Sequence, residues 1–210
     1  KLFSYGVLVI VVGVLLSFFQ QAVGINVVLY YAPRIFQNMG SSGDSAMIQT
    51  VVMGVVNILF TIIAILTVDR WGRKILLIIG SIGMFIGMTA LSILSFSDVI
   101  GVAALVFIII YTASFMMSWG PICWVLISEI FPNTIRSKAV AVAVAAQWIS
   151  NYAVSSTFPS LCEWSIGGTY LIYAGFAALS ALFVLKMVPE TKGKTLEEMS
   201  ALWRSKMKKR

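Results

Sequence analysis

Apolar residues recur along the chain in six long runs that short polar segments separate. A helix of about 20 apolar residues crosses the roughly 30 Å hydrocarbon core of a bilayer. The short alternating strands of a porin-like barrel would not give runs of this length. We therefore predict an all-α membrane protein with six transmembrane helices, which run roughly over residues 5–31, 46–68, 75–95, 100–127, 139–158 and 170–188.

The composition agrees with a membrane location. Of the 210 residues, 60% are hydrophobic and 11% are charged, and the mean hydropathy is +0.96. An ordinary soluble domain has roughly 45–50% apolar and about 25% charged residues. The first apolar run is longer than the core of a signal peptide and lacks a small-residue cleavage site, so we interpret it as a span.

Basic residues fall on one side of the predicted membrane. The chain has 15 Lys and Arg, and only Arg34 lies in a connection that follows an odd-numbered span. Because cytoplasmic loops are enriched in positive charge, we expect both termini of this multi-pass protein in the cytoplasm. The net charge of +7 therefore reflects topology, and binding of nucleic acid has no support.

Three amide side chains interrupt the first span. Gln20 and Gln21 are followed by Asn26, and on a straight helix Asn26 would lie about 140° round the axis from Gln21. Burial of an unpartnered amide in lipid costs several kcal/mol. A bend at Gly24 would let the three groups turn toward one cavity. Each amide is then either a ligand group or a bond between neighbouring helices.

Further polar and helix-breaking residues occur in the middle of other spans. In the fourth span Gly120 and Pro121 are expected to break the helix, because proline removes a backbone hydrogen bond. The first and fourth spans begin the two three-helix halves, so both halves would open with an interrupted helix. That pattern is typical of a midplane binding site in transporters. The remaining mid-span residues of interest are Asn57, Gln147, Trp148, Trp119 and Trp124.

These groups suit an uncharged ligand. Amides donate and accept hydrogen bonds, and indole or phenol rings offer flat apolar faces, a combination that fits a sugar ring. The spans hold no ionisable residue near their centres, and the chain has no histidine. Cys123 and Cys162 are expected to form neither a disulfide nor a metal site. We therefore expect no metal, no cofactor and no enzyme, since the spans lack a constellation of nucleophile, base and metal ligands.

Two cytoplasmic connections carry matching charges. DRWGRK follows the second span, and SEIFPNTIR follows the fourth span in the equivalent place of the second half. Asp69 and Arg73 of the first connection are expected to pair with Glu129 and Arg136 of the second. The resulting charge cluster would hold the cytoplasmic side closed and break when that side opens.

The last segment of the chain differs from the spans. PETKGKTLEEM leaves the sixth span with a helix-stopping proline and restarts as an amphipathic helix. We therefore divide the chain into a six-helix transmembrane bundle at 1–188 and a cytoplasmic amphipathic tail at 189–210.

Taken in order, QQAVGIN followed by YY, DRWGRK, SEIFPNTIR and PETKGKTLEE resemble the sugar porter family of the major facilitator superfamily, in its C-terminal six-helix half. The resemblance covers essentially the whole chain. It implies two inverted three-helix repeats, an N-terminal half as partner, and alternating-access transport of a monosaccharide of the D-xylose or glucose class. It also implies a location in the plasma membrane, the inner membrane of a bacterium. It also implies sugar contacts by Gln20, Gln21, Asn26, Tyr30, Asn57, Gly120, Trp124, Gln147 and Trp148, with Phe115 as an apolar wall.

Several alternatives stay open at this stage. In the family, the groups that couple transport to protons lie in the N-terminal half, so symport and facilitated transport both fit this chain. The six-helix half either pairs with that N-terminal half or self-associates as a dimer. A six-helix channel or pore-forming oligomer is the rival function, and its flux would rise linearly with solute concentration where a carrier saturates. A purely structural scaffold would leave the buried amides and broken helices unexplained.

Overall fold

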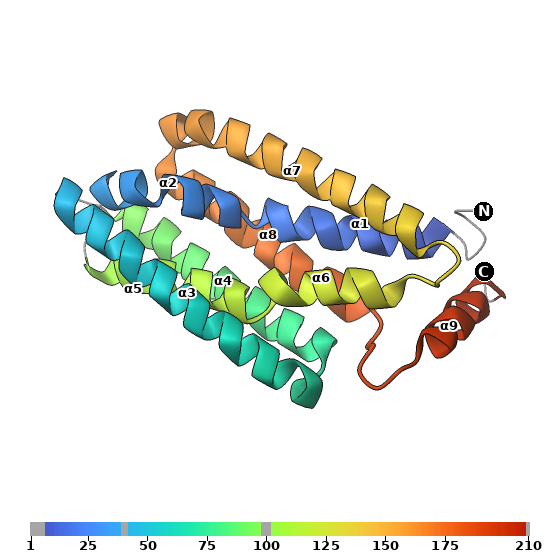
Figure 1. The fold of residues 1–210 in the computed structure, drawn as a ribbon. Coiled ribbons are helices and arrows are strands. Elements are labelled where there is room, and N and C mark those ends of the chain that lie inside the picture. The colour runs from blue at the N-terminus through green and yellow to red at the C-terminus, as the bar shows by residue number, and fades with distance from the viewer. Residues whose placement is uncertain (1–6, 39–41, 98–101, 209–210) are drawn as a thin grey trace.

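The computed structural model of the chain describes residues 7–38, 42–97 and 102–208. Within these ranges every regular element is an α-helix, and the long helices lie side by side with a shorter helix at one end (Figure 1). The helices are α1 (Val7–Ala22), α2 (Ile25–Asn38), α3 (Gly43–Trp71), α4 (Arg73–Phe96), α5 (Val102–Met117), α6 (Trp119–Ile130), α7 (Arg136–Trp164), α8 (Ile166–Met187) and α9 (Leu196–Lys208).

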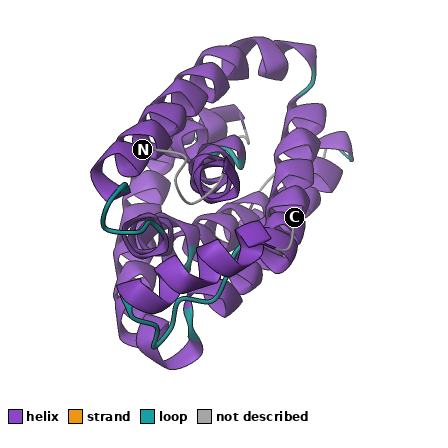
Figure 2. Cartoon of the chain, turned by 90° about the vertical axis from the view of Figure 1, so that its right-hand side faces the viewer, coloured by secondary structure: helices purple, strands orange, loops and turns teal. Residues whose placement is uncertain are grey.

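The helices form two repeats of three membrane passages, as the sequence predicted. The first repeat consists of α1 with α2, then α3 and α4, and the second consists of α5 with α6, then α7 and α8. An odd number of passages per repeat inverts the second repeat relative to the first. The packing is reciprocal, because α1 packs on α7, α5 on α3, and α4 on α8. Figure 2 shows the bundle from the right-hand side of Figure 1, so that its helices are seen obliquely or end-on.

Helical passages cover all six predicted spans, and they are not equally apolar. Among the described residues, five stretches are long and apolar enough to cross a membrane: Val7–Gln37, Gly43–Trp71, Arg73–Phe96, Ala103–Ile130 and Ile166–Met187. α7 covers the remaining predicted span and has 29 residues, a sufficient length. It carries more polar side chains than the others, and it buries Gln147 and Asn151. The sequence prediction therefore placed this span correctly and described it as more apolar than it is.

Gly24 interrupts the first passage, as the sequence predicted. α1 ends at Ala22 and α2 begins at Ile25. The φ angle of Gly24 is 89°, a conformation that glycine adopts readily and other residues rarely do. The break frees backbone groups, and the hydroxyl of Tyr111 donates a 2.7 Å hydrogen bond to the carbonyl of Val23 there. Such a partner is what makes irregular backbone tolerable at membrane depth.

The interruption of the second repeat lies at Ser118, between α5 and α6. Gly120 and Pro121 occupy the first turn of α6. The sequence had placed the break at these two residues, so that prediction was wrong by a few positions. Proline is tolerated in a first helical turn because the N–H groups there have no intrahelical acceptor. The two residues therefore begin a new helix instead of ending an old one.

Small residues bring α4 close to the second break. A Cβ added to Gly80 would collide with the side chain of Ser118, and one added to Gly87 would lie 2.9 Å from Cβ of Tyr111. Lipid chains give apolar helices no hydrophobic reason to associate, so close van der Waals packing of small residues stabilises the contact. The backbone around the α5–α6 break is thus held against a continuous helix.

The tail packs against the end of the bundle. After α8 ends at Met187, the chain continues through Pro189 to α9. Trp203 is 1% exposed, and its Nε1 donates a 3.0 Å hydrogen bond to the carbonyl of Ile130, the last residue of α6. Met199 is buried on the same helix. α9 is therefore anchored to the end of α6 by its apolar side.

Candidate substrate site

A cavity of about 280 Å³ lies where both helix breaks meet α7. Helix breaks can aim several side chains at one point, whereas a straight helix would spread them around its axis. Eight of the nine residues to which the sequence assigned ligand contacts line this cavity, together with Phe115. The lining residues are Gln20, Gln21, Ile25, Asn26, Leu29, Tyr30, Phe115, Met116, Gly120, Trp124, Gln147 and Trp148.

Gln20 connects the two broken passages. Its side chain is 3% exposed, and its Nε2 donates to the carbonyl of Trp119 at 3.0 Å and to that of Gly120 at 3.3 Å. A carbonyl oxygen has two lone pairs, so it accepts such a bond in addition to a helical one. The last turn of α1 and the first turn of α6 are therefore joined at the cavity wall.

Gln21 and Asn26 extend this network across the first break. Gln21 Nε2 donates to Gln20 Oε1 at 3.4 Å, and Asn26 Nδ2 donates to Gln21 Oε1 at 2.6 Å. Asn26 Nδ2 also donates to Oδ1 of Asn151 on α7 at 3.0 Å. The turn at Gly24 makes the contact between Asn26 and Gln21 possible, since a straight helix would point these two side chains in different directions. The amides thus act both as bonds between helices and as cavity lining.

Gln147 offers hydrogen-bonding capacity to the cavity. It is 5% exposed, lines the cavity from α7, and its Oε1 has no hydrogen-bond partner among the described residues. A buried amide oxygen without a partner is costly, and a bound hydroxyl group would remove that cost. Gln147 is therefore the lining residue best prepared to accept a hydrogen bond from a ligand.

Aromatic rings form the more open side of the cavity. Trp148, Tyr30 and Trp124 are 61%, 59% and 45% exposed, although all three line the cavity. Phe115 is 4% exposed and forms part of the inner wall of the cavity. The site is a hollow with a buried amide floor and exposed aromatic edges.

Asn57 lies outside this cavity, unlike the other residues predicted for the site. It is 7% exposed on α3, and its Oδ1 has no hydrogen-bond partner among the described residues. α3 is a continuous helix that packs on α5 and α2, so no break turns Asn57 toward the other amides. The ligand contact that the family resemblance implies for Asn57 therefore stays a prediction.

A buried polar network holds the start of α6 from behind the site. Trp119 is fully buried, and its Nε1 donates to Ser81 Oγ at 2.8 Å and to the carbonyl of Leu77 at 3.2 Å. Ser81 Oγ in turn lies 2.9 Å from Ser180 Oγ on α8. Trp119 carries one of the carbonyls that Gln20 binds. This Trp119 network therefore fixes the position of the Gln20 acceptor against α4 and α8.

Comparison with known proteins finds relatives over the whole chain. The sugar (and other) transporter family matches residues 1–203. The chain belongs to this sugar transporter family. The D-xylose-proton symporter of Escherichia coli (strain K12) is 55% identical over 216 residues, which cover 100% of this chain and 44% of the symporter. The glucose facilitated diffusion protein of Zymomonas mobilis subsp. mobilis is 46% identical over 97% of this chain and 45% of its own length.

Solved structures agree with this family assignment. The proton:xylose symporter XylE of the major facilitator superfamily, bound to 6-bromo-6-deoxy-D-glucose, matches with a TM-score of 0.89 at 56% identity over 96% of this chain and 44% of that one. An inward open conformation of XylE from E. coli matches with a TM-score of 0.86 at 55% identity over 95% of this chain. This sugar transporter chain spans less than half the length of the relatives it matches.

The predicted charge cluster is present in part at the end of the sugar transporter chain that carries the basic connections. Arg73 Nη1 lies 2.9 Å from Asp69 Oδ1, and Arg73 Nη2 lies 3.0 Å from Glu129 Oε1. Arg136 is directed instead to the carbonyl of Phe131, to which Nε and Nη2 both donate at 3.3 Å. Arg136 thus stabilises the loop between α6 and α7 and takes no part in the two ion pairs of Arg73.

Two residues of the connection after α8 complete the cluster, and the sequence analysis had not assigned them a role. Glu190 accepts hydrogen bonds from the backbone N–H groups of Arg73 and Lys74, both at 3.1 Å, and so caps the start of α4. Thr191 Oγ1 donates to Glu129 Oε2 at 2.6 Å. The cluster therefore joins α3, α4, α6 and the connection to α9. No local pattern in PETKGK predicts a cap on a helix more than a hundred residues earlier.

Asn151 is the site residue that the sequence could have revealed. It follows Gln147 by four residues on α7, and residues at that spacing share one face of a helix. Ser81 and Ser180 gave no comparable indication, because serines in membrane helices usually bond their own backbone. Their role depends on the tertiary contact with Trp119.

Proposed function

We propose that this chain is the C-terminal half of a transporter that moves a monosaccharide of the D-xylose or glucose class by alternating access. The observation that carries the proposal is the cavity where the two helix breaks and α7 bring four amides and two indole rings together. A pair of broken helices at matching places of two repeats is typical of a midplane transport site. The sugar would lie between this half and an N-terminal half.

The chemistry of the cavity supports a neutral polyhydroxylated ligand. None of the described residues that line it carries a charge. The amide of Gln147 can accept and donate hydrogen bonds to hydroxyl groups, and the exposed faces of Trp124 and Trp148 can pack on the C–H face of a sugar ring. A charged substrate would need a counter-ion, which such sites in membranes provide by an ionisable side chain.

The relatives support the same substrate class. The E. coli relative is a D-xylose-proton symporter, and the Zymomonas relative is a glucose facilitated diffusion protein. One carbon more or less in a pocket changes discrimination by about 1–3 kcal/mol, so pentose and hexose selectivity depends on small differences in shape. The names of the two relatives differ in energy coupling. None of the described lining residues carries a charge, so we assign any proton-coupling groups to the N-terminal half.

The orientation follows from the charged connections. DRWGRK, the loop between α6 and α7, and α9 lie at one end of the bundle, the right-hand end in Figure 1. By the positive-inside rule we assign this end, with both termini, to the cytoplasmic side. The bacterial relatives support a bacterial inner membrane as the location. The tail beyond the bundle is then a cytoplasmic helix that packs on the end of α6.

The charge cluster is our candidate for the cytoplasmic gate. Arg73 bridges two carboxylates from α3 and α6, and Glu190 and Thr191 bring in the connection to α9. Ion pairs that form in one state of a carrier and break in the other bias the equilibrium between those states. Asp69, Arg73 and Glu129 are therefore proposed to favour the state closed to the cytoplasm, with Arg136 holding the adjoining loop.

The open side of the cavity requires a partner. An N-terminal half would cover Tyr30, Trp124 and Trp148, which are all more than 40% exposed in this chain alone. A second copy of the chain is the alternative cover, and native mass spectrometry distinguishes a homodimer from a monomer. The lipid bilayer surrounds the remaining apolar faces, such as that of α3.

Binding of sugar to the purified chain tests the site. We expect D-xylose to change tryptophan fluorescence in a saturable way, because Trp124 and Trp148 line the cavity. Gln147→Ala should weaken this binding about tenfold or more through the loss of a buried hydrogen bond. Gln37→Ala, at the exposed end of α2, is the matched control and should leave affinity unchanged. Saturable binding that Gln147→Ala leaves intact would contradict the site.

A further inference from the structure

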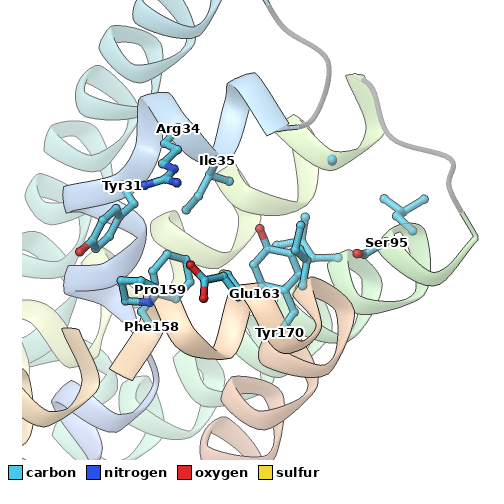
Figure 3. Close-up of a pocket in the computed structure, with 13 residues that line it drawn as sticks. Tyr31, Arg34, Ile35, Ser95, Phe158, Pro159, Glu163 and Tyr170 are labelled. Carbon is cyan, nitrogen blue, oxygen red and sulfur yellow. The ribbon is translucent and has the colours of Figure 1, made fainter. Parts of the chain in front are cut away.

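A second cavity lies at the opposite end of the bundle from the charge cluster. It has a volume of about 240 Å³ and is bordered by α2, α7, the end of α4 and the starts of α5 and α8 (Figure 3). It shares no lining residue with the substrate cavity. Pockets for drug-sized ligands measure about 300–1,000 Å³, so this outer cavity suits a small molecule.

The walls of the outer cavity are mostly apolar. Ile35, Leu91, Ala104 and Tyr170 are all buried and line it from four different helices. Tyr31 of α2 packs its ring on that of Phe158 of α7, with centroids 5.0 Å apart. This ring pair closes one side of the cavity between the two helices, so the interior favours an apolar body.

Two opposite charges lie at the opening of the outer cavity. Arg34 extends from α2 and Glu163 from α7, and both side chains reach into the space between these helices (Figure 3). Both are exposed, and within the described residues neither takes part in an ion pair. A guanidinium and a carboxylate on opposite sides of an opening complement a ligand that carries one anionic and one cationic group.

α2 lies between the two cavities. Tyr30 lines the substrate cavity, and its neighbour Tyr31 lines the outer cavity with Arg34. Consecutive residues of a helix point about 100° apart, which explains how one short helix serves both. α2 is also the segment that Gly24 separates from α1. A ligand in the outer cavity would therefore hold α2 against α7 and affect the substrate cavity.

We propose that the outer cavity binds a small zwitterion with an apolar body, its anionic group on Arg34 and its ammonium group on Glu163, and that this binding is coupled through α2 to the sugar site. Two kinds of molecule carry this pair of charged groups: a free zwitterion such as an apolar amino acid, and the headgroup of a zwitterionic lipid. The coupling rests on the proposed function, and the binding itself does not.

The binding is tested with L-leucine as the probe and the purified chain in nanodiscs of phosphatidylglycerol. We expect saturable binding of radiolabelled leucine in a scintillation-proximity assay. 4-Methylpentanoate lacks the ammonium group and 3-methylbutylamine lacks the carboxylate, so each should compete at least about tenfold more weakly than leucine. Arg34→Gln and Glu163→Gln should each weaken leucine binding by a similar factor, and Arg70→Gln at the other end of the bundle should not.

A pair of substitutions on α5 separates the cavity from the fold. Ala104→Leu places a larger side chain in the outer cavity and should abolish leucine binding, whereas Ala103→Leu adds the same side chain on the exposed face of α5. The lipid source is tested by adding phosphatidylethanolamine and counting retained lipids by native mass spectrometry. If Arg34→Gln and Ala104→Leu both reduce the number of retained phosphatidylethanolamine molecules, the occupant is a lipid headgroup. The proposal is wrong if these substitutions change the binding of neither leucine nor phosphatidylethanolamine.

The coupling is tested by titrating D-xylose with and without saturating leucine, or phosphatidylethanolamine where the lipid is the occupant. Because linkage is reciprocal, we expect the occupant to change D-xylose affinity about fivefold or more, and D-xylose to change the affinity of the occupant by the same factor. Ala104→Leu should remove the effect. Unchanged D-xylose affinity would overturn the coupling, whereas absence of any D-xylose binding without the occupant would mark a failure of the proposed function instead.

Discussion

At the scale of single residues, the substrate cavity depends on amides that have partners inside the protein. Gln20 donates to two carbonyls of α6, and Asn26 donates to Gln21 and Asn151. An amide with such bonds is held in one orientation before a ligand arrives, which lowers the entropy lost on binding. Gln147 differs, because its oxygen has no partner in the described part of the chain. The network positions the site, and Gln147 offers the free acceptor.

The Trp119 network gives a prediction for a residue that touches no ligand. Trp119→Phe keeps an aromatic ring and removes the N–H that Ser81 and the carbonyl of Leu77 accept. We expect the free energy of unfolding to fall by about 1–2 kcal/mol, because a buried acceptor loses its donor. SDS titration in mixed micelles, followed by circular dichroism, measures this change. Trp71→Phe is the control at a ring that is 52% exposed, and an equal loss in both variants would contradict a role for the hydrogen bonds.

Sequence reasoning identified the amides because polar groups in an apolar run need a partner or a ligand. That argument holds for Gln20, Gln21, Asn26 and Gln147, which all line the cavity. Asn57 is buried on α3 and does not line the cavity, so its assignment to the site from the family resemblance stays a prediction. The Trp119 network was missed because its hydrogen bonds join α4, α6 and α8, and the sequence does not show how these helices are rotated toward one another.

At the scale of elements, the first helix break depends on one glycine. The φ angle of Gly24 is 89°, and a Cβ there would lie 3.0 Å from the ring of Tyr173. We expect Gly24→Ala to lower the free energy of unfolding by about 1–3 kcal/mol. Gly54→Ala is the matched control, because Gly54 lies within α3 with open space around it. That change should stabilise the chain by about 0.5–1 kcal/mol.

The same SDS titration measures both glycine variants. Opposite signs for Gly24→Ala and Gly54→Ala are the expected result, and a stabilising Gly24→Ala would show that the break does not need a positive φ angle.

The cap on α4 gives a second prediction at this scale. Glu190 accepts hydrogen bonds from the first two N–H groups of α4. Glu190→Ala leaves those donors without the carboxylate and removes a negative charge from a helix N-terminus, so stability should fall by about 1–2 kcal/mol. Differential scanning fluorimetry measures the shift in Tm. Glu197→Ala on α9 should cost less, because Glu197 is exposed, and equal shifts would contradict the capping role.

The elements themselves were predictable to a large extent. Long apolar runs gave the helical passages, and Gly24 gave the first break, because chain composition alone limits what can cross a bilayer. The second break was expected at Gly120 and Pro121 and lies at Ser118, since proline is compatible with the first turn of a helix. The sequence predicted a more apolar α7. This helix is more polar because its polar face packs toward the site.

At the scale of the whole molecule, the proposed substrate cavity is open on one side. The amide floor is buried, while the aromatic edges at Tyr30 and Trp148 are about 60% exposed. The relatives are more than twice as long as the part that matches this chain. A second half that covers these edges would complete the cavity, exclude water and allow the two faces to open alternately.

Uptake of D-xylose into proteoliposomes tests this account most directly. The protein would join this chain to the N-terminal half of the E. coli D-xylose-proton symporter, which is 55% identical to it over the shared region. Monodispersity by gel filtration and a cooperative thermal transition would first establish that the joined protein is folded. We predict uptake that saturates with D-xylose concentration and that Gln20→Ala reduces about tenfold or more. The account would be contradicted if D-xylose uptake by the folded protein rises linearly with concentration and Gln20→Ala leaves it unchanged.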